Sequence, residues 1–152
     1  LEILIYASLL VLLIVLMANA VASLSHLISD AKTERALRSS AEAALERIAR
    51  EIRFAETTDA ASVFDANPGT LVLTSVDPFT EAAQTITISV SSGRVTIQKN
   101  TSPVNQLTSE SVSATSLVFR HITNGSVSES VRVELTVGGK NFYNTTVLRR
   151  SY

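Results

Sequence analysis

The pattern of apolar and polar positions changes twice along the chain. Residues 1–27 are almost continuously apolar, and Ile3 to Ala22 supplies the roughly 20 residues that a helix needs to cross a bilayer. From Ser29 to Phe54 there is no Gly or Pro, and apolar side chains recur every three or four residues. From Thr70 onward apolar and polar residues alternate instead. The pattern predicts one helix of about 50 residues, apolar in its first half and amphipathic in its second, followed by strands.

The alternating region predicts five or six strands separated by turn residues. The turn signals are Ser91-Ser92-Gly93, Asn124-Gly125 and Gly138-Gly139, and Asn100 to Ala114, which contains Pro103, is expected to be a surface loop. The predicted strands are residues 70–75, 84–90, 94–99, 116–122, 130–137 and 142–150. We expect an α+β fold, in which the amphipathic half of a long N-terminal helix packs on one antiparallel β-sheet.

Composition narrows the classes of function. The 152-residue chain has a net charge of −1 and no cysteine. A near-neutral chain lacks the basic face that nucleic-acid phosphates require, and a chain without cysteine forms no disulfide and no thiolate metal site. The length allows one small domain plus an appendage. We therefore predict a membrane-spanning segment at residues 1–28 and a globular domain at residues 29–152.

No pattern of catalytic or ligand-binding residues is apparent. Neither His26 nor His121 belongs to a recognisable acid–base or nucleophile motif, and the chain contains no nucleophile elbow or phosphate-binding loop. Three loop aspartates, Asp59, Asp65 and Asp77, are spaced unlike a calcium-binding EF-hand. We expect no enzyme activity, no metal and no cofactor. Glycosylation-type sequons begin at Asn100, Asn124 and Asn144.

Glu2 is an acidic residue in an otherwise almost continuously apolar segment. No other Asp, Glu, Lys or Arg precedes Asp30, and a charge at the centre of a bilayer costs roughly 3 kcal/mol or more. A simple membrane anchor needs no such acid. Glu2 therefore either lies at a wet interface, where the helix dipole favours it, or awaits a cationic partner.

The first residues resemble the N terminus of type IV pilins and type II secretion pseudopilins. Leu1-Glu2-Ile3-Leu4-Ile5, followed by a long apolar helix, matches the Leu-Glu of that family, in which the glutamate is the fifth mature residue. The resemblance implies that about three mature residues and a peptidase-processed leader precede Leu1. A weaker likeness links AALERIAREIRFA and FYNTTVLRRSY to minor pilins of the J or W type.

The resemblance implies a role for the apolar half-helix in assembly. Glu2 would pair with the N-terminal amine of a neighbouring subunit, in a filament core formed by Ile3, Ile5, Leu9, Leu10, Leu12, Leu13 and Leu16. The family's helix-breaking Gly or Pro is absent, so any melting of the helix is expected around Asn19 and Ala20 or not at all. The implied partners are copies of this chain in a helical homopolymer, the inner-membrane assembly machinery, a prepilin peptidase and, before assembly, the lipid bilayer.

Three functions remain open from the sequence. The leading one is a structural subunit of a type IV pilus-like filament, located in the cytoplasmic membrane before assembly and at the cell surface afterwards. The second is a minor pseudopilin of a type II secretion-like system, a branch that the lack of cysteine favours. The third is a single-pass membrane protein with a binding ectodomain, which should tolerate the loss of the Glu2 carboxylate.

Overall fold

The computed structural model describes residues 1–77, 79–110, 112–124 and 128–148. The chain divides into two compact units, residues 1–36 and residues 37–152. A single helix, α1 (Glu2–Phe54), begins in the first unit and ends in the second. Its 53 residues confirm the predicted helix of about 50. The predicted boundary between residues 28 and 29 separates a membrane segment from a domain, and it stays a prediction.

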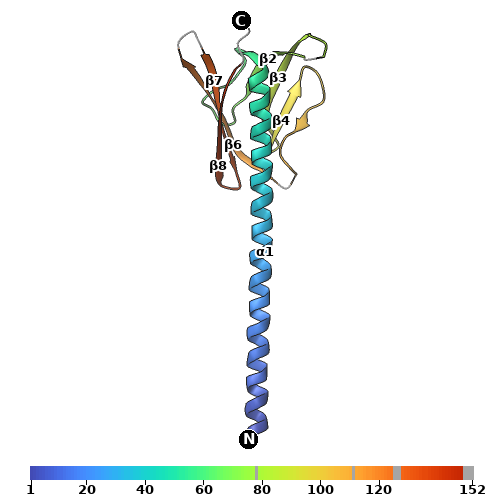
Figure 1. Ribbon diagram of the computed structural model, residues 1–152, viewed down its shortest axis with the longest axis vertical. Coiled ribbons are helices and arrows are strands. Elements are labelled where there is room, and N and C mark those ends of the chain that lie inside the picture. The colour runs from blue at the N-terminus through green and yellow to red at the C-terminus, as the bar shows by residue number, and fades with distance from the viewer. Residues whose placement is uncertain (78, 111, 125–127, 149–152) are drawn as a thin grey trace. The chain divides into compact units, whose positions relative to one another are not determined.

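The second unit contains two antiparallel sheets (Figure 1). In the five-stranded sheet, each strand is hydrogen-bonded to the next one along the chain. These strands are β1 (Ala55–Thr58), β2 (Leu71–Val76), β3 (Ala83–Ser91), β4 (Arg94–Lys99) and β5 (Asn105–Gln106). The three-stranded sheet is likewise a meander, formed by β6 (Ala114–Asn124), β7 (Ser128–Val137) and β8 (Lys140–Val147). The α+β fold class predicted from the sequence is confirmed.

The core of this unit lies where residues 37–54 of α1 meet both sheets (Figure 1). The helix contributes residues spaced three and four apart, as the apolar stripe predicted: Ala41, Ala44, Leu45, Ile48 and Ile52 are all buried. Alternate residues of the strands face them, among them Leu71 and Leu73, Ile86 and Ile88, Leu117 and Phe119, and Val131, Val133 and Leu135. Burying this apolar surface is what holds the helix against the sheets.

The prediction of one sheet was wrong, because alternation identifies the buried face of a strand but not its neighbour. Between the two sheets the backbone of Ala114 donates a hydrogen bond to Gly93 O (2.7 Å), without a continuing ladder. The register of β6 then shifts between Ala114 and Ser116, a bulge of the kind that bends a strand. The five-stranded and three-stranded sheets are therefore separate surfaces around one core.

Two local predictions also need correction. The sequence Ala55–Thr58 contains no apolar alternation, yet it forms β1, which pairs with β2 directly after the helix ends. Ser75 Oγ donates a hydrogen bond to Phe54 O (3.0 Å) at that junction. The segment 100–114 was expected to be a surface loop, but β5 extends the five-stranded sheet there, and Thr108, Val112 and Ala114 are buried.

The tight turns follow their sequence signals. Ser92 and Gly93 connect β3 to β4 with φ values of 52° and 71°, the left-handed pair that a two-residue hairpin of type I′ requires. Gly138 and Gly139 connect β7 to β8 in the same way, with φ values of 57° and 75°. Gly125 of the predicted Asn124-Gly125 turn and the end of the last predicted strand, residues 149–150, fall outside the described residues.

One charged residue of the helix is buried. Glu51 is 5% exposed. Arg47 Nη2 lies 2.9 Å from Glu51 Oε1, and Lys99 Nζ of β4 lies 3.1 Å from Oε2. The carboxylate therefore has a cation at each oxygen, which offsets the cost of removing it from water.

Candidate functional site

Residues 1–28 of the first unit present an almost continuously apolar helix surface. Every residue from 1 to 36 is exposed. The side chains predicted to form a filament core range from 48% exposed at Leu13 to 83% at Ile3, and they are Ile3, Ile5, Leu9, Leu10, Leu12, Leu13 and Leu16. A helix satisfies its own backbone hydrogen bonds, so this surface suits lipid or other apolar helices. By length and composition, α1 contains a segment that could cross a membrane.

Glu2 begins this helix. It is exposed and lies in the first turn of α1, where the positive end of the helix dipole favours a carboxylate. No hydrogen bond or ion pair joins its side chain to any other residue that the structure describes. The geometry leaves the carboxylate available to a partner outside this chain, and its predicted pairing with a neighbouring N-terminal amine stays a prediction.

Asn19 and Ala20, where melting of the helix was considered, are helical and exposed in this structure. The α-helical backbone runs through them without interruption. Unwinding of the helix at this turn stays a prediction.

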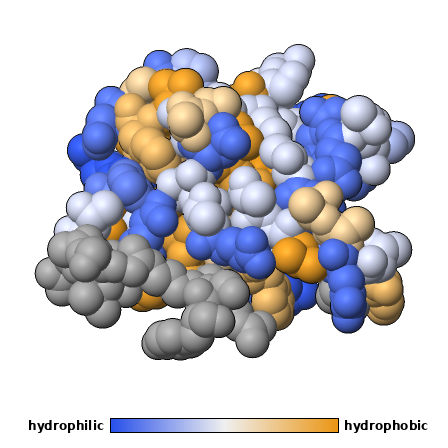
Figure 2. All heavy atoms as spheres, turned by 90° about the horizontal axis from the view of Figure 1, so that it is seen from above, coloured by the Kyte–Doolittle hydropathy of each residue, from blue (hydrophilic) through white to orange (hydrophobic). Residues whose placement is uncertain are grey.

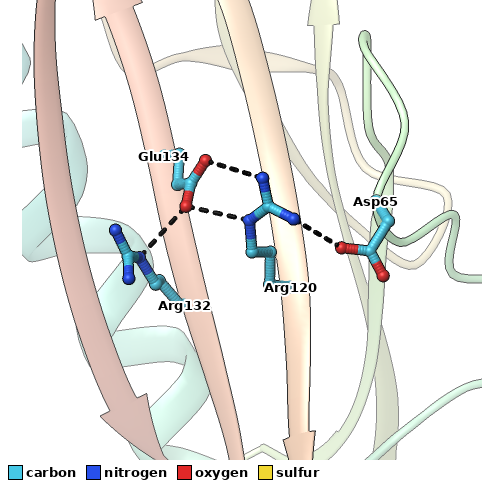
Figure 3. A network of polar contacts seen from close by, with 4 residues as sticks. All are labelled: Asp65, Arg120, Arg132 and Glu134. Atoms are coloured by element: carbon cyan, nitrogen blue, oxygen red, sulfur yellow. Dashed lines mark hydrogen bonds and ion pairs between the residues drawn. The ribbon is translucent and has the colours of Figure 1, made fainter.

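A polar network lies on the outer face of the three-stranded sheet (Figure 3). Arg120 of β6 binds both oxygens of Glu134 of β7, with Nε–Oε1 and Nη2–Oε2 distances of 2.9 and 3.4 Å, and its Nη1 lies 3.1 Å from Asp65 Oδ1. Arg132 Nε forms an ion pair with the same Oε1 at 3.1 Å, without hydrogen-bond geometry. Its guanidinium also lies over the ring of Tyr143.

This network ties together β6, β7 and the loop that precedes β2. The hydrogen bond from Arg120 is the main reason that the pKa of Glu134 lies below its usual value, and the same contact raises the pKa of Arg120. Four charged groups that neutralise one another offer little attraction to an outside ion. We interpret the network as a structural feature of the sheet.

A second polar cluster connects the two sheets. Glu129 Oε1 of β7 accepts a hydrogen bond from the hydroxyl of Thr58 in β1, and it lies 2.7 Å from His121 Nε2. The imidazole of His121 also stacks on Phe64, with ring centroids 5.0 Å apart. No pattern in the sequence predicted this cluster, because residues 58 and 64 are distant along the chain from residues 121 and 129. The Thr58 hydroxyl is bonded to the carboxylate and not to the imidazole, so His121 is not placed to act as its base.

The three loop aspartates lie in separate places. Asp65 binds Arg120, whereas Asp59 and Asp77 accept hydrogen bonds from backbone N–H groups within their own turns. The backbone N–H groups of Phe79 and Thr80 lower the pKa of Asp77. Among the described residues, no three His, Asp or Glu side chains come together as metal ligands would.

The three sequons differ in their surroundings. Asn100 is exposed at a turn with φ of 50°, and its Oδ1 accepts a hydrogen bond from the backbone of Thr85 (2.8 Å). Asn144 is half-buried in β8. Asn124 ends β6, and the rest of its sequon is outside the described residues. Glycosylation at these positions stays a prediction.

The surface of the globular unit has no comparable apolar region in the view of Figure 2. Apolar side chains there form small patches separated by polar ones (Figure 2). Phe79, at 93% exposed, lies alone in the turn between β2 and β3. The continuous apolar surface of the chain is that of residues 1–28, which we take as the candidate functional site.

No protein-family model matches the chain, and no curated protein or solved structure matches it either. Its function must therefore be inferred from its own residues and geometry.

Proposed function

We propose that this chain is a structural subunit of a type IV pilus-like filament. The apolar helix would anchor the subunit in the cytoplasmic membrane and then pack with the helices of other copies once the subunits leave the membrane. The globular unit, residues 37–152, would form the outer surface of the filament. The proposal includes the assembly machinery and a prepilin peptidase as partners, and it assigns no catalytic step to the chain.

One observation carries this proposal: a single helix has two different surroundings along its length. Residues 41–52 are buried at every third or fourth position in a domain core, whereas residues 1–36 are exposed throughout. The apolar part of that exposed helix, residues 1–28, needs either lipid or other helices around it. Burial between neighbouring copies, at about 25 cal/mol per Å² of apolar surface, would supply most of the cohesion of a filament.

Glu2 favours a filament over a permanent anchor. Its carboxylate has no partner among the described residues of its own chain, and a subunit that moves from the bilayer into an apolar core would need a cation there. The N-terminal amine of the next copy would provide that cation. Removing one partner of a buried ion pair of this kind costs about 3–5 kcal/mol. It would therefore fix the axial register of each new subunit.

The same helix supports two other functions, which we keep as alternatives. A minor pseudopilin of a secretion system would use the same contacts but occupy only the tip of a short filament. A single-pass protein with a binding ectodomain would keep residues 1–28 in the membrane and would not use Glu2. These alternatives differ in where the chain is located and in whether the Glu2 carboxylate matters.

Replacement of Glu2 tests the proposal. In cells that assemble the filament, Glu2→Ala should abolish or strongly reduce filaments recovered by shearing, while the membrane-bound pool of the protein remains. The control is Glu46→Ala, which removes an exposed carboxylate from the globular part of the same helix and should leave the filament yield unchanged. Equal yields from wild type and Glu2→Ala would contradict the proposed role of Glu2 and favour the anchored ectodomain.

A further inference from the structure

One polar side chain lies within the apolar helix at a depth that lipid surrounds. Between Glu2 and Asp30 there is no Asp, Glu, Lys or Arg. A bilayer core accommodates about 20 helical residues, and every window of that length between Ile3 and Ser29 includes residues 10–22. Within residues 10–22, Asn19 is the only polar side chain. Its amide is therefore inside the hydrocarbon wherever the helix is placed.

The amide of Asn19 has no partner within the described part of the chain. It is exposed, and no side-chain hydrogen bond joins it to its own helix. Ser8, by contrast, donates its hydroxyl hydrogen to Ile5 O (2.8 Å), so a small hydroxyl can satisfy itself along the helix. An amide has two donor hydrogens and an acceptor oxygen, and lipid chains offer no hydrogen-bond partner for either. An unpaired amide in hydrocarbon is costly.

Three of the other polar side chains of the segment share the face of Asn19, and Tyr6, about 140° away, does not. With 3.6 residues per turn, Ser8 and His26 lie within about 20° of Asn19 around the helix, and Ser23 within about 40°. Ser25 and Ser29 lie off this face, close to the charged end of the segment. The same face follows the alternating four-three spacing of a helix–helix seam, formed by Ile5, Leu9, Leu12, Leu16, Asn19, Ser23 and His26.

We propose that Asn19 pairs with Asn19 of a second copy of this chain within the membrane. An amide donates and accepts at once, so two amides satisfy each other, and identical parallel helices place them at the same depth. Ala22 lies within about 60° of Asn19 around the helix, and its small side chain allows close approach of helix backbones. The inference rests on the membrane location in the proposed function, but it concerns subunits before they enter a filament.

This pairing would have a definite consequence for assembly. A single polar residue in an apolar seam specifies register and partner number more than it adds affinity. Subunits would therefore be held in the membrane as parallel pairs with a fixed helix face in contact. When the helices enter the filament, this contact would have to break or be kept as one of the contacts between subunits.

The test uses the full chain, purified and inserted in phosphatidylcholine vesicles with no other protein. Association is measured by energy transfer between donor-labelled and acceptor-labelled copies, at several protein-to-lipid ratios. Asn19→Leu should lower the association constant by about 3- to 30-fold, the range that interhelical polar contacts give in membranes. Asn19→Gln, which keeps the amide, should retain most of it. Met17→Leu changes a residue of similar depth on nearly the opposite face and should leave association unchanged.

Because the chain has no cysteine, single-cysteine variants show which face is in contact. Leu12→Cys, within about 20° of Asn19, should form disulfide-linked dimers on oxidation, whereas Leu10→Cys, about 180° away, should not. Equal cross-linking at the two positions would overturn the proposed seam. A wild type that stays monomeric, or an Asn19→Leu variant that associates as tightly as wild type, would overturn the pairing.

Resistance to extraction by alkaline carbonate separates these failures from failure of the proposed function. If the variants insert but do not pair through Asn19, only this inference falls, and the role of Glu2 in filaments is still judged by the shearing experiment. If the chain does not insert at all, the membrane stage of the proposed function falls together with the pairing.

Discussion

Lys99 donates a hydrogen bond from Nζ to Oε2 of the buried Glu51 across 3.1 Å, and this contact joins the helix to strand β4. The other carboxylate oxygen is held by Arg47, one turn earlier in the same helix. Glu51 is thus the one charged residue among the buried positions of α1. Its contact with Lys99 adds a polar link between the helix and the five-stranded sheet.

Removal of the Glu51 carboxylate should destabilise the globular unit. Glu51→Ala leaves Lys99 and Arg47 without their acceptor, and we expect a loss of about 1–3 kcal/mol in the free energy of unfolding. The loss stays below that of a fully buried pair because both cations are partly exposed. Urea unfolding of the full chain in detergent micelles, followed by circular dichroism, measures it.

The matched control is Glu46→Ala in the same helix. Glu46 is exposed and lies 3.9 Å from Arg50, so its removal should change stability by less than about 0.5 kcal/mol. Both substitutions introduce the same helix-favouring alanine, so the helix propensity cancels in the comparison. Equal effects of the two changes would show that the contact between Glu51 and Lys99 contributes nothing.

Stability should fall in acid partly through Glu134. The pKa of its folded carboxyl lies below the usual 4.5, chiefly because Arg120 donates a hydrogen bond to it. The unfolded chain therefore takes up this proton at a higher pH than the folded one does. The contribution is complete above pH 4.5 and is lost as the pH falls through the folded pKa.

Glu134→Gln should remove this part of the acid sensitivity. We expect its urea midpoint to fall less between pH 7 and pH 3 than that of wild type, while Asp77, whose pKa is also lowered, keeps its own share. A pH dependence as steep in Glu134→Gln as in wild type would contradict the assignment.

Gly138 and Gly139 offer a matched pair at the turn between β7 and β8. Both have positive φ, so alanine at either position should cost about 1–2 kcal/mol. At Gly138 the added Cβ would also lie 3.0 Å from Leu37 Cδ1, whereas at Gly139 it meets nothing within 4 Å. We expect Gly138→Ala to cost roughly 1 kcal/mol more, because Leu37 is half-buried and must shift.

The contact with Leu37 can be removed to check this explanation. In a Leu37→Ala background the two alanine substitutions should become equal in unfolding free energy. A difference that persists without the Leu37 side chain would mean that the turn, and not the contact with the helix, sets the cost.

Local patterns in the sequence predicted the local structure well. The four- and three-residue spacing of Ala41, Leu45 and Ile48 gave the buried helix face, and the strand Arg94–Lys99 was predicted at its observed bounds. The pairing of the strands was harder to predict, because the alternation of apolar and polar residues does not identify the neighbours of a strand. The short strand Ala55–Thr58 had no apolar pattern at all, and only its pairing with β2 makes it a strand.

Candidate sites were predicted only where one segment carries the chemistry. Glu2 and the apolar residues behind it are contiguous, so the sequence alone located the exposed helix. The contacts of Glu51 with Lys99 and of Glu129 with Thr58 and His121 join residues from distant segments. No spacing rule reveals such contacts.

The most direct test of a filament subunit is where the protein lies on native cells. Sheared surface material is examined by electron microscopy with gold-labelled antibody against the globular unit, residues 37–152. The account predicts label along the whole length of thin filaments. Label at filament tips alone would indicate a minor subunit, and label confined to membranes, with unlabelled filaments or none, would contradict the filament and leave the membrane-anchored ectodomain.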